Sequence, residues 1–401
     1  MIFKSKFRML TTLSFFCVFI LGSCTPSSTA LPPNPSDSQQ PPTPTEVQGS
    51  DINTPFPETS PFEVRLAWYY NKPRTDEDML QILNWYNFFI LIKGDEKSRD
   101  QMLSLGARRP ILQYLDFEAI HDPGSCDEWP QENQVADQPG DFCWISQEHP
   151  DWFLLDTNGE RMLVTEDDYE WYLMDIGITG WREFFIERVR QNMTDHNWDG
   201  VFLDNVEVTF AFFEDDERLP ARYPSEAAYQ VAVQGFLEYL HTGYFQPNRK
   251  LLFANLVARK DDADWTKYIT HLDGVMHEGW AIDWPDRFRS PDTWEKHMIL
   301  AERTQEMGKD IILVSQGTKD DLELQEFAFA SYLLVNQGRA IFRYANSSKY
   351  REVWVYENYN VSLGSPLGPR YKDGDAWRRD FTNGTVMVNP ETHTSEIQSI
   401  K

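Results

Sequence analysis

Residues 198–207 read WDGVFLDNVE, a stretch in which an apolar strand runs directly into an acid. The run from Val201 to Leu203 predicts a buried strand, and Asp204 stands at its carboxyl end. Seven further short apolar runs occur along the chain, at residues 64–70, 88–94, 109–116, 250–256, 273–280, 310–317 and 339–346. Nearly unbroken apolar strands of this kind are typical of a parallel sheet that is covered on both faces.

The segments between these runs carry helix signals. Thr75 and Ser225 are predicted N-caps, and each precedes an acidic first turn or an apolar pattern with helical spacing. Eight strands alternating with helices place the chain in the α/β class and favour a closed (β/α)8 TIM barrel over an open doubly wound sheet. No glycine-rich phosphate loop follows the first strand, which argues against a dinucleotide-binding sheet.

Two regions do not fit the alternation. Residues 117–178 show no strand or helix period, and we expect an irregular segment there. Near the end, WRRDFTNGTVMVNP (377–390) places an Asn383-Gly384 turn between strand-like residues, which predicts a β hairpin and a small β appendage to the barrel. The sequence thus predicts a barrel unit over residues 62–390 and a tail over residues 391–401.

The first residues have the pattern of an export signal. Residues 1–23 combine three early cations with an apolar run that is too short to span a bilayer comfortably, and they end at Cys24 in Leu-Gly-Ser-Cys. This ending resembles a bacterial lipobox, so we expect an exported lipoprotein on the cell surface or the periplasmic face of a membrane, lipidated at Cys24. Ordinary signal cleavage is the alternative. Residues 24–61 are rich in Pro, Ser and Thr and predict a disordered stalk.

The remaining cysteines support export. Cys17 would leave with the signal peptide, which leaves Cys126 and Cys143 as an even pair in an exported chain, and a disulfide is the natural pairing. The enclosed loop has no His at ligand spacing beside the cysteines, so metal binding by this pair is not expected.

The charge balance limits the partners. The 63 acidic residues against 37 basic ones give a formal net charge of −26, which argues against nucleic acid and against an anionic polymer as substrate. The plainest interpretation is solubility outside the cell. We expect a monomer that needs no cofactor.

Barrel enzymes place their chemistry at the carboxyl ends of the strands, so the polar residues there are the candidates. Acids and amides hydrogen-bond to hydroxyls, and aromatic faces pack on the apolar faces of sugar rings. The residues at this rim that we expect to bind substrate are Tyr69, Asp116, Asn205, Asn255, Trp280, Gln316 and Arg343. Cations are sparse at this rim. His277 is the one histidine at these strand ends, and one is too few for a typical metal site.

Hydrolysis of a glycosidic bond needs two carboxyl groups on opposite sides of the anomeric carbon. Asp204 on the fourth strand and Glu278 on the sixth are the best pair, with Asp116 as a third acid and Glu207 as a loop residue. The alternative for any one of these acids is a strand-end cap or an ion pair. Sequence leaves retention or inversion of the anomeric centre open.

Three motifs carry a family resemblance. WDGVFLDN (198–205), MHEGW (276–280) and the terminal WRRDFTNGTVMVNP resemble a family of glycoside-hydrolase-like TIM barrels found in bacteria, related to the endo-α-1,4-polygalactosaminidase-like hydrolases. The likeness runs from about Phe62 to Pro390. It implies a carbohydrate-active barrel in which Asp204 is the nucleophile and Glu278 the acid and base.

Two other functions compete with this prediction. A barrel that holds a glycan at the cell surface without cutting it would use the same aromatic and amide residues. A deacetylase-type metalloenzyme would need a His/Asp cluster, which the sequence does not offer.

Overall fold

The computed structural model describes residues 63–166, 169–210, 218–257, 262–283 and 287–400. The predicted signal peptide (1–23), the lipidation site Cys24 and the stalk (24–61) lie outside the described residues. Within them, no helix combines the length and apolar character that a membrane span requires.

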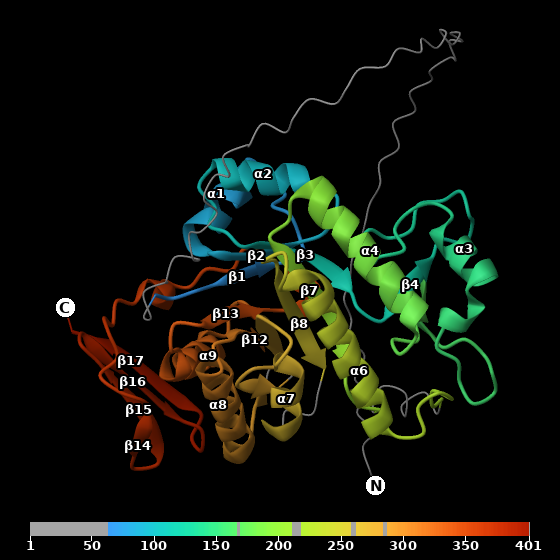
Figure 1. The fold of residues 1–401 in the computed structure, drawn as a ribbon. Coiled ribbons are helices and arrows are strands. Elements are labelled where there is room, and N and C mark those ends of the chain that lie inside the picture. The colour runs from blue at the N-terminus through green and yellow to red at the C-terminus, as the bar shows by residue number, and fades with distance from the viewer. Residues whose placement is uncertain (1–62, 167–168, 211–217, 258–261, 284–286, 401) are drawn as a thin grey trace, which may run out of the picture.

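Eight parallel strands form the central sheet, in the order β1-β2-β3-β7-β8-β9-β12-β13 (Figure 1). Their bounds are β1 Ala67–Tyr69, β2 Phe88–Leu91, β3 Ile111–Asp116, β7 Gly200–Glu207, β8 Leu251–Val257, β9 Gly274–Glu278, β12 Asp310–Gln316 and β13 Ala340–Ala345. A parallel bridge between Leu66 and Phe342, with a 2.8 Å hydrogen bond from Phe342 N to Arg65 O, joins the last strand to the start of the first. The predicted TIM barrel is confirmed.

The helices surround this sheet (Figure 1). They are α1 Asp76–Trp85, α2 Glu96–Ser104, α4 Thr179–His196, α6 Glu226–Leu240, α7 Asp262–Ile269, α8 Pro291–Glu306 and α9 Leu322–Val335, with the π-helical turn η2 His241–Phe245 after α6. Both predicted caps are present, since Thr75 Oγ accepts from Asp78 N at 3.0 Å and the Ser225 hydroxyl accepts from Ala228 N at 3.3 Å. Short elements in the connecting segments are β10 Ile282–Asp283, β11 Arg287–Phe288, η3 Ser347–Lys349 and η4 Glu357–Asn360.

Alternation along the strands separates two cores. One set of side chains fills the barrel interior, among them Ala67, Phe88, Ile90, Leu112, Phe202, Phe253, Met276, Ile312 and Ile341. The neighbouring residues on the same strands, such as Leu203, pack outward against the helices. Because side chains alternate with a period of two, Asp204 shares the inward face of Phe202 and lies at the mouth of the barrel.

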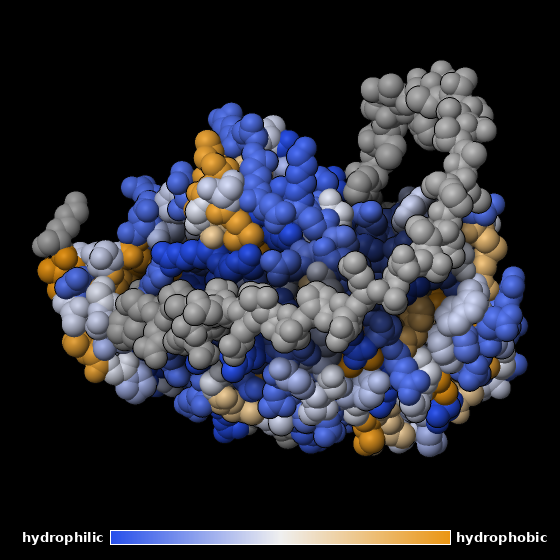
Figure 2. Space-filling model, turned by 45° about the horizontal axis from the view of Figure 1, so that its top comes forward, coloured by the Kyte–Doolittle hydropathy of each residue, from blue (hydrophilic) through white to orange (hydrophobic). Residues whose placement is uncertain are grey.

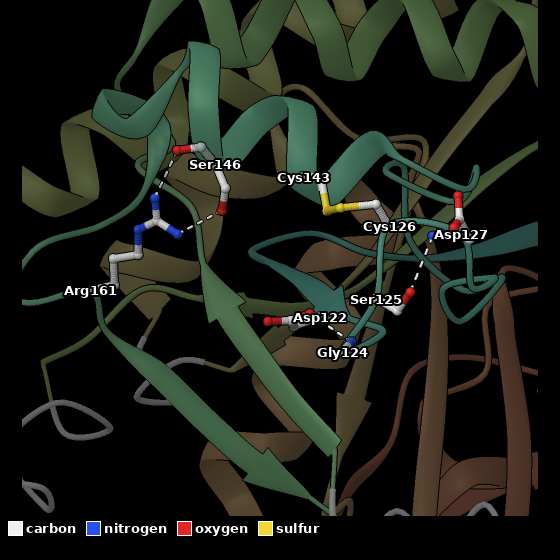
Figure 3. The surroundings of a disulfide bond; sticks show 8 residues. All are labelled: Asp122, Gly124, Ser125, Cys126, Asp127, Cys143, Ser146 and Arg161. Atoms are coloured by element: carbon white, nitrogen blue, oxygen red, sulfur yellow. Dashed lines mark hydrogen bonds between the residues drawn. A yellow bond between two sulfur atoms is a disulfide. The ribbon is translucent and has the colours of Figure 1, made fainter.

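Residues 117–178 form an excursion from the carboxyl end of β3. It contains β4 Ala119–Asp122, α3 Asp141–Glu148, η1 Pro150–Trp152, β5 Leu163–Glu166 and β6 Tyr169–Leu173, with a three-stranded sheet in the order β4-β6-β5. The expectation of an irregular segment is therefore wrong. The predicted disulfide is confirmed: Cys143 on α3 is bonded to Cys126, which lies in the loop before this helix (Figure 3).

The C-terminal appendage is larger than the predicted hairpin. β14 Tyr371–Asp373, β15 Ala376–Phe381, β16 Gly384–Asn389 and β17 Thr394–Ser399 form a four-stranded antiparallel sheet, at the lower left of Figure 1. The β15–β16 pair is the expected hairpin, but a tail over residues 391–401 does not exist as such, because β17 pairs with β16 along its length. Arg379 fixes the sheet to the barrel by donating to the carbonyls of Leu333, Leu334 and Asn336 at the end of α9.

The surface matches the acidic composition. On the face drawn in Figure 2, hydrophilic residues dominate and apolar ones are confined to small separate patches.

Candidate active site

Three neighbouring strands bring the predicted carboxylates together. Asp204 ends the inward face of β7, Asn255 that of β8 and Glu278 that of β9, and these strands are adjacent in the barrel. The amide nitrogen of Asn255 donates to Asp204 Oδ1 at 3.0 Å and to Glu278 Oε2 at 3.2 Å. One side chain therefore joins the two acids.

This shared donor limits the separation of the two carboxylate oxygens that it binds. Both oxygens are bonded to the same nitrogen, so they cannot be further apart than about 6 Å, the sum of the two hydrogen bonds. A planar amide points its two N–H bonds in different directions, which places the oxygens about 5 Å apart. Glycosidases that retain configuration have carboxyl groups about 5–5.5 Å apart, and inverting enzymes about 6.5–9.5 Å.

Asp204 accepts several hydrogen bonds in a buried place. Only 1% of the residue is exposed, and its carboxylate also accepts from the Tyr114 hydroxyl at 2.8 Å and from the backbone N–H of Asn205 at 2.9 Å. Burial raises the pKa of Asp204, while the hydrogen bonds from Asn255 and Tyr114 oppose this rise. The carboxylate is thus oriented from three sides.

Glu278 is more exposed than Asp204 and has a different set of partners. Its Oε1 accepts from the Tyr350 hydroxyl at 2.9 Å and from Gln316 Nε2 at 3.1 Å, and Gln316 Nε2 also donates to the Tyr350 hydroxyl at 2.9 Å. Burial raises the pKa of Tyr350 well above its ordinary value, so this phenol stays protonated and donates.

Asp116 and Asn205 form a second pair at the same rim. Asn205 Nδ2 donates to Asp116 Oδ2 at 2.9 Å, and Asp116 Oδ1 accepts from the backbone N–H groups of Glu118 and Ala119. Burial raises the pKa of Asp116 to about 7. Asn205 adopts a left-handed φ of 55°, which Asn tolerates better than most residues, at a point where the register between β7 and β8 shifts.

Two more acids, Glu207 and Glu118, lie near Asp116. Glu207 is not a loop residue as predicted; it is the last residue of β7 and only 8% exposed. It lies near Glu118, which is 7% exposed. Burial raises the pKa of Glu118, and the neighbouring carboxylates of Glu207 and Asp116 raise it further.

Three of the expected substrate-binding residues have side chains that contact other parts of the protein. Trp280 is fully buried and packs with His277 and His297 outside the barrel, because the backbone turns through left-handed conformations at Gly279 and Ala281. Arg343 is 1% exposed, and its guanidinium donates to the carbonyls of Ala67 and Tyr350.

Tyr69 is the third. It is 1% exposed, and its ring lies against Tyr350 with the ring centroids 5.0 Å apart. Tyr69 and Arg343 thus both contact Tyr350, the first through its ring and the second through a hydrogen bond to the Tyr350 carbonyl. The expected residues that the structure does bring together around the two carboxylates are Asp116, Asn205, Asn255 and Gln316.

Sequence reasoning missed Tyr350, which lies just after η3, beyond the end of the last strand. Tyr114 was visible as a polar residue on the third strand, but its bond to Asp204 depends on the barrel register. Near the rim, Lys93 is paired with Asp137 of the disulfide-bonded loop.

No set of three or more His, Cys, Asp and Glu side chains suited to a metal ion occurs in the part of the chain that the structure describes. What the arrangement offers is two closely spaced carboxylates, several hydrogen-bond donors aimed at them, and amide groups beside them. Such a site is suited to proton transfer and to nucleophilic attack at an acetal carbon.

Solved structures with a similar fold include several glycoside hydrolases. The glycoside hydrolase domain of PelA from Pseudomonas aeruginosa is 13% identical, with a TM-score of 0.47 over 73% of this chain and 97% of that one. The noncanonic maltogenic α-amylase AmyB from Thermotoga neapolitana is 12% identical, with a TM-score of 0.45 over 81% and 86% of the two chains. The trehalose-6-phosphate hydrolase TreA from Bacillus licheniformis is 12% identical, with a TM-score of 0.44 over 71% and 64%.

No curated protein matches the chain. A family model does, over residues 110–385, which is more than half of the sequence and includes Asp204, Asn255 and Glu278. On this match, the chain belongs to hypothetical glycosyl hydrolase family 15.

Proposed function

We propose that this protein is a retaining glycoside hydrolase that cleaves O-glycosidic bonds of a poly- or oligosaccharide, with Asp204 as nucleophile and Glu278 as general acid and base. The observation that carries the proposal is the Asn255 amide bonded to both carboxylates. It holds one oxygen of each carboxylate within about 6 Å of the other, which supports the close spacing of retaining enzymes over the wider spacing that leaves room for a water between the second carboxylate and the sugar.

The division of roles follows from exposure. The acid and base must exchange a proton with the leaving group and with water in each turnover, which suits the more exposed Glu278. Asp204 is 1% exposed and oriented by three donors, which suits a group that must attack one carbon along one line.

The proposed reaction has two steps. In the first, an Asp204 carboxylate oxygen attacks the anomeric carbon while Glu278 gives its proton to the departing glycosidic oxygen, and a glycosyl ester forms on Asp204. In the second, Glu278 takes a proton from water as the water oxygen attacks the same carbon, and the ester bond to Asp204 breaks. The second step restores both residues to their starting states.

Amides at the rim are the proposed substrate contacts. Asn255 Oδ1 is buried, and it has no hydrogen-bond partner in the described part of the chain. A buried carbonyl oxygen in this position is suited to accept a hydrogen bond from a sugar hydroxyl. Asp116, Asn205 and Gln316 are proposed to bind neighbouring hydroxyls.

The test is cleavage and its stereochemistry. Wild type, Asp204→Asn and Glu278→Gln are screened for new reducing ends on α-1,4-linked polygalactosamine, its N-acetylated form and amylose. Each variant is expected to lose at least about 10³-fold in rate, near the upper range of a general acid or base contribution, with an unchanged circular dichroism spectrum. The first product seen by NMR is expected to have the configuration of the substrate.

Azide rescue separates the two roles. With azide, Glu278→Ala is expected to give a glycosyl azide of retained configuration, because azide replaces the water that attacks the glycosyl ester. Asp204→Ala is expected to give one of inverted configuration, because azide replaces the missing nucleophile. Full activity in both carboxylate variants, or inversion by the wild type, would sink the proposal. Tight glycan binding without turnover would favour the competing function of a carbohydrate-binding lipoprotein.

We further propose that the hydrolase acts at a membrane surface as a monomer, anchored through lipid on Cys24. The support is the signal-like residues 1–23, the Leu-Gly-Ser-Cys ending and the proline-rich residues 24–61. Replacement of Cys24 by Ala is expected to move the protein from the membrane fraction to the soluble fraction and to abolish labelling by radioactive palmitate. An unchanged membrane fraction in that variant would contradict the anchor.

A further inference from the structure

An aromatic surface lies on the excursion, on the β4–β6 strand pair. His121 of β4 is directly opposite Trp171 of β6, and Tyr169 stands two residues along β6 on the same face. The His121 ring lies 5.0 Å from the Tyr169 ring and 5.4 Å from the Trp171 ring, measured between centroids. We call these three residues the aromatic face.

The opposite face of the same strands packs against α3. There, Tyr172 lies against Phe142 of α3 and against Phe153. On the aromatic face, Tyr169 is 40% exposed and Trp171 is partly exposed. Large, partly exposed rings in a row on a small sheet are suited to stack on the apolar faces of sugar rings.

His121 adds a directional polar group beneath these rings. Its Nδ1 accepts a hydrogen bond from Gln131 N at 3.3 Å, so the proton of the neutral ring is on Nε2. Burial lowers the pKa of His121, which keeps the ring neutral. His121 is only 4% exposed, and its Nε2 has no hydrogen-bond partner among the described residues. A buried N–H without an acceptor is costly, and a ligand oxygen would satisfy it.

The strands that carry the aromatic face start next to the proposed active site. Strand β4 begins three residues after Asp116, whose Oδ1 accepts from Ala119 N at 2.8 Å, and Met174 N, next to the end of β6, donates to Glu118 O at 2.7 Å. At about 3.3 Å per residue, Trp171 lies about 7 Å beyond the Ala119 position and Tyr169 about 7 Å further. The two rings therefore lie at increasing distance along β6 from the end that adjoins the rim.

The disulfide-bonded loop borders this face. Gln131, which bonds to His121, lies between Cys126 and Cys143, and the disulfide restrains the loop that presents it. Trp129, two residues before Gln131, is 67% exposed. The same loop reaches the barrel rim, where Asn133 O accepts from Asp116 N.

We infer that the aromatic face is a remote subsite that binds the polysaccharide substrate several sugars away from the scissile bond. The inference rests on the proposed function, since it assigns the chain held there to the substrate of Asp204 and Glu278. The rings of Tyr169 and Trp171 stack on sugar faces, and the unpartnered His121 Nε2–H donates to a hydroxyl or amide oxygen. An uncharged or cationic glycan fits, because the protein carries a net charge of −26.

Binding without turnover tests the inference separately from catalysis. In a Glu278→Gln background, affinity is measured by native gel retardation in α-1,4-linked polygalactosamine, its N-acetylated form and amylose. Tyr169→Ala is expected to weaken the affinity for the polymer that binds by about tenfold, in line with the loss of one stacked ring. Tyr169→Phe is expected to restore it, since stacking needs the ring and not the hydroxyl.

Tyr371→Ala is the matched control. Tyr371 is 42% exposed, close to Tyr169, but it lies on β14 of the C-terminal sheet. Its replacement is expected to leave the affinity unchanged. The subsite is contradicted if Tyr169→Ala binds as tightly as its parent, if Tyr371→Ala weakens binding equally, or if no polymer retards the parent.

The two proposals fail in different ways. Loss of retardation in Tyr169→Ala together with no cleavage by the wild type would support the subsite and count against the hydrolase. Cleavage of a polymer at equal rates by wild type and Tyr169→Ala, with equal affinities, would support the hydrolase and remove the subsite.

Discussion

The Tyr350 hydroxyl donates a 2.9 Å hydrogen bond to Oε1 of Glu278, although the two residues are 72 positions apart in the chain. Tyr350 follows the last barrel strand, and Glu278 ends the sixth. Tyr69 packs against the phenol ring, and Arg343 binds the Tyr350 carbonyl. The proposed acid is thus oriented by a residue that is itself held on two sides.

Tyr350→Phe is expected to impair protonation of the leaving group. The substitution keeps the ring and removes only the hydrogen bond, so Glu278 loses its orientation toward the glycosidic oxygen. We expect kcat/KM to fall about 10–100-fold on substrates with poor leaving groups and little on a dinitrophenyl glycoside, which needs no proton. An equal fall on both substrates would assign Tyr350 to structure and not to positioning.

Tyr114→Phe is expected to shift the acidic limb of the pH profile. The Tyr114 hydroxyl stabilises the charged form of Asp204, so its removal raises the pKa of Asp204 further. The nucleophile must be ionised, so activity is lost as pH falls through this pKa, and in the variant the loss begins at a higher pH. Profiles of kcat/KM against pH for both proteins check this, and coincident acidic limbs would contradict it.

Asp116 is expected to make stability depend on pH. Its pKa is about 7 in the folded chain and about 3.9 in an unfolded one. Between these values the folded state keeps a proton that the unfolded state has lost. The contribution of Asp116 to the free energy of unfolding is therefore present at pH 4 and is lost as pH rises through 7. Asp116→Asn cannot titrate and keeps an oxygen for the N–H groups of Glu118 and Ala119.

The measurement for Asp116 is urea unfolding of both proteins at pH 4.5 and pH 8. The free energy of unfolding of the wild type minus that of the variant is expected to be larger at pH 4.5 than at pH 8, by about 3 kcal/mol at most. A difference that is the same at both pH values would show that Asp116 does not titrate in this range.

The disulfide is expected to stabilise the excursion. Replacing Cys126 and Cys143 together by Ala opens a loop with a sequence separation of 17, which corresponds to about 3 kcal/mol of loop-closure entropy. The double variant should unfold at a lower temperature and be cut faster by protease within residues 126–143. Reductant should lower the unfolding temperature of the wild type to that of the variant and leave the variant unchanged; a shift in both would point to another cause.

The barrel could be predicted from the sequence because its strands are buried on both faces. Runs such as 310–317 and 339–346 contain few polar residues, and they match β12 and β13 to within a residue or two. The strands of the excursion and of the C-terminal sheet lack this signal. In β17, Ile397 is the only large apolar residue of the strand. The strand forms because it is hydrogen-bonded to β16 along its length, which a sequence pattern does not reveal.

The site could be predicted in part for a related reason. Asp204, Asn255 and Glu278 follow apolar strands, so the end-of-strand rule was enough to select them. The rule fails where the backbone leaves the strand geometry, as at Gly279, after which Trp280 turns toward the helices. It also cannot select Tyr350, whose place depends on a loop path and on contacts with distant strands.

Asn255 has a consequence for how this enzyme can change. Its amide acts as a spacer of fixed length between the two acids, and it stands on a barrel strand and not on a loop. In the proposed mechanism, the stereochemical course is therefore set by the rigid part of the molecule, while the excursion that would hold the distant sugars is a separate, disulfide-bonded insertion. Substitutions in the excursion can alter which glycan is chosen without altering the configuration of the product.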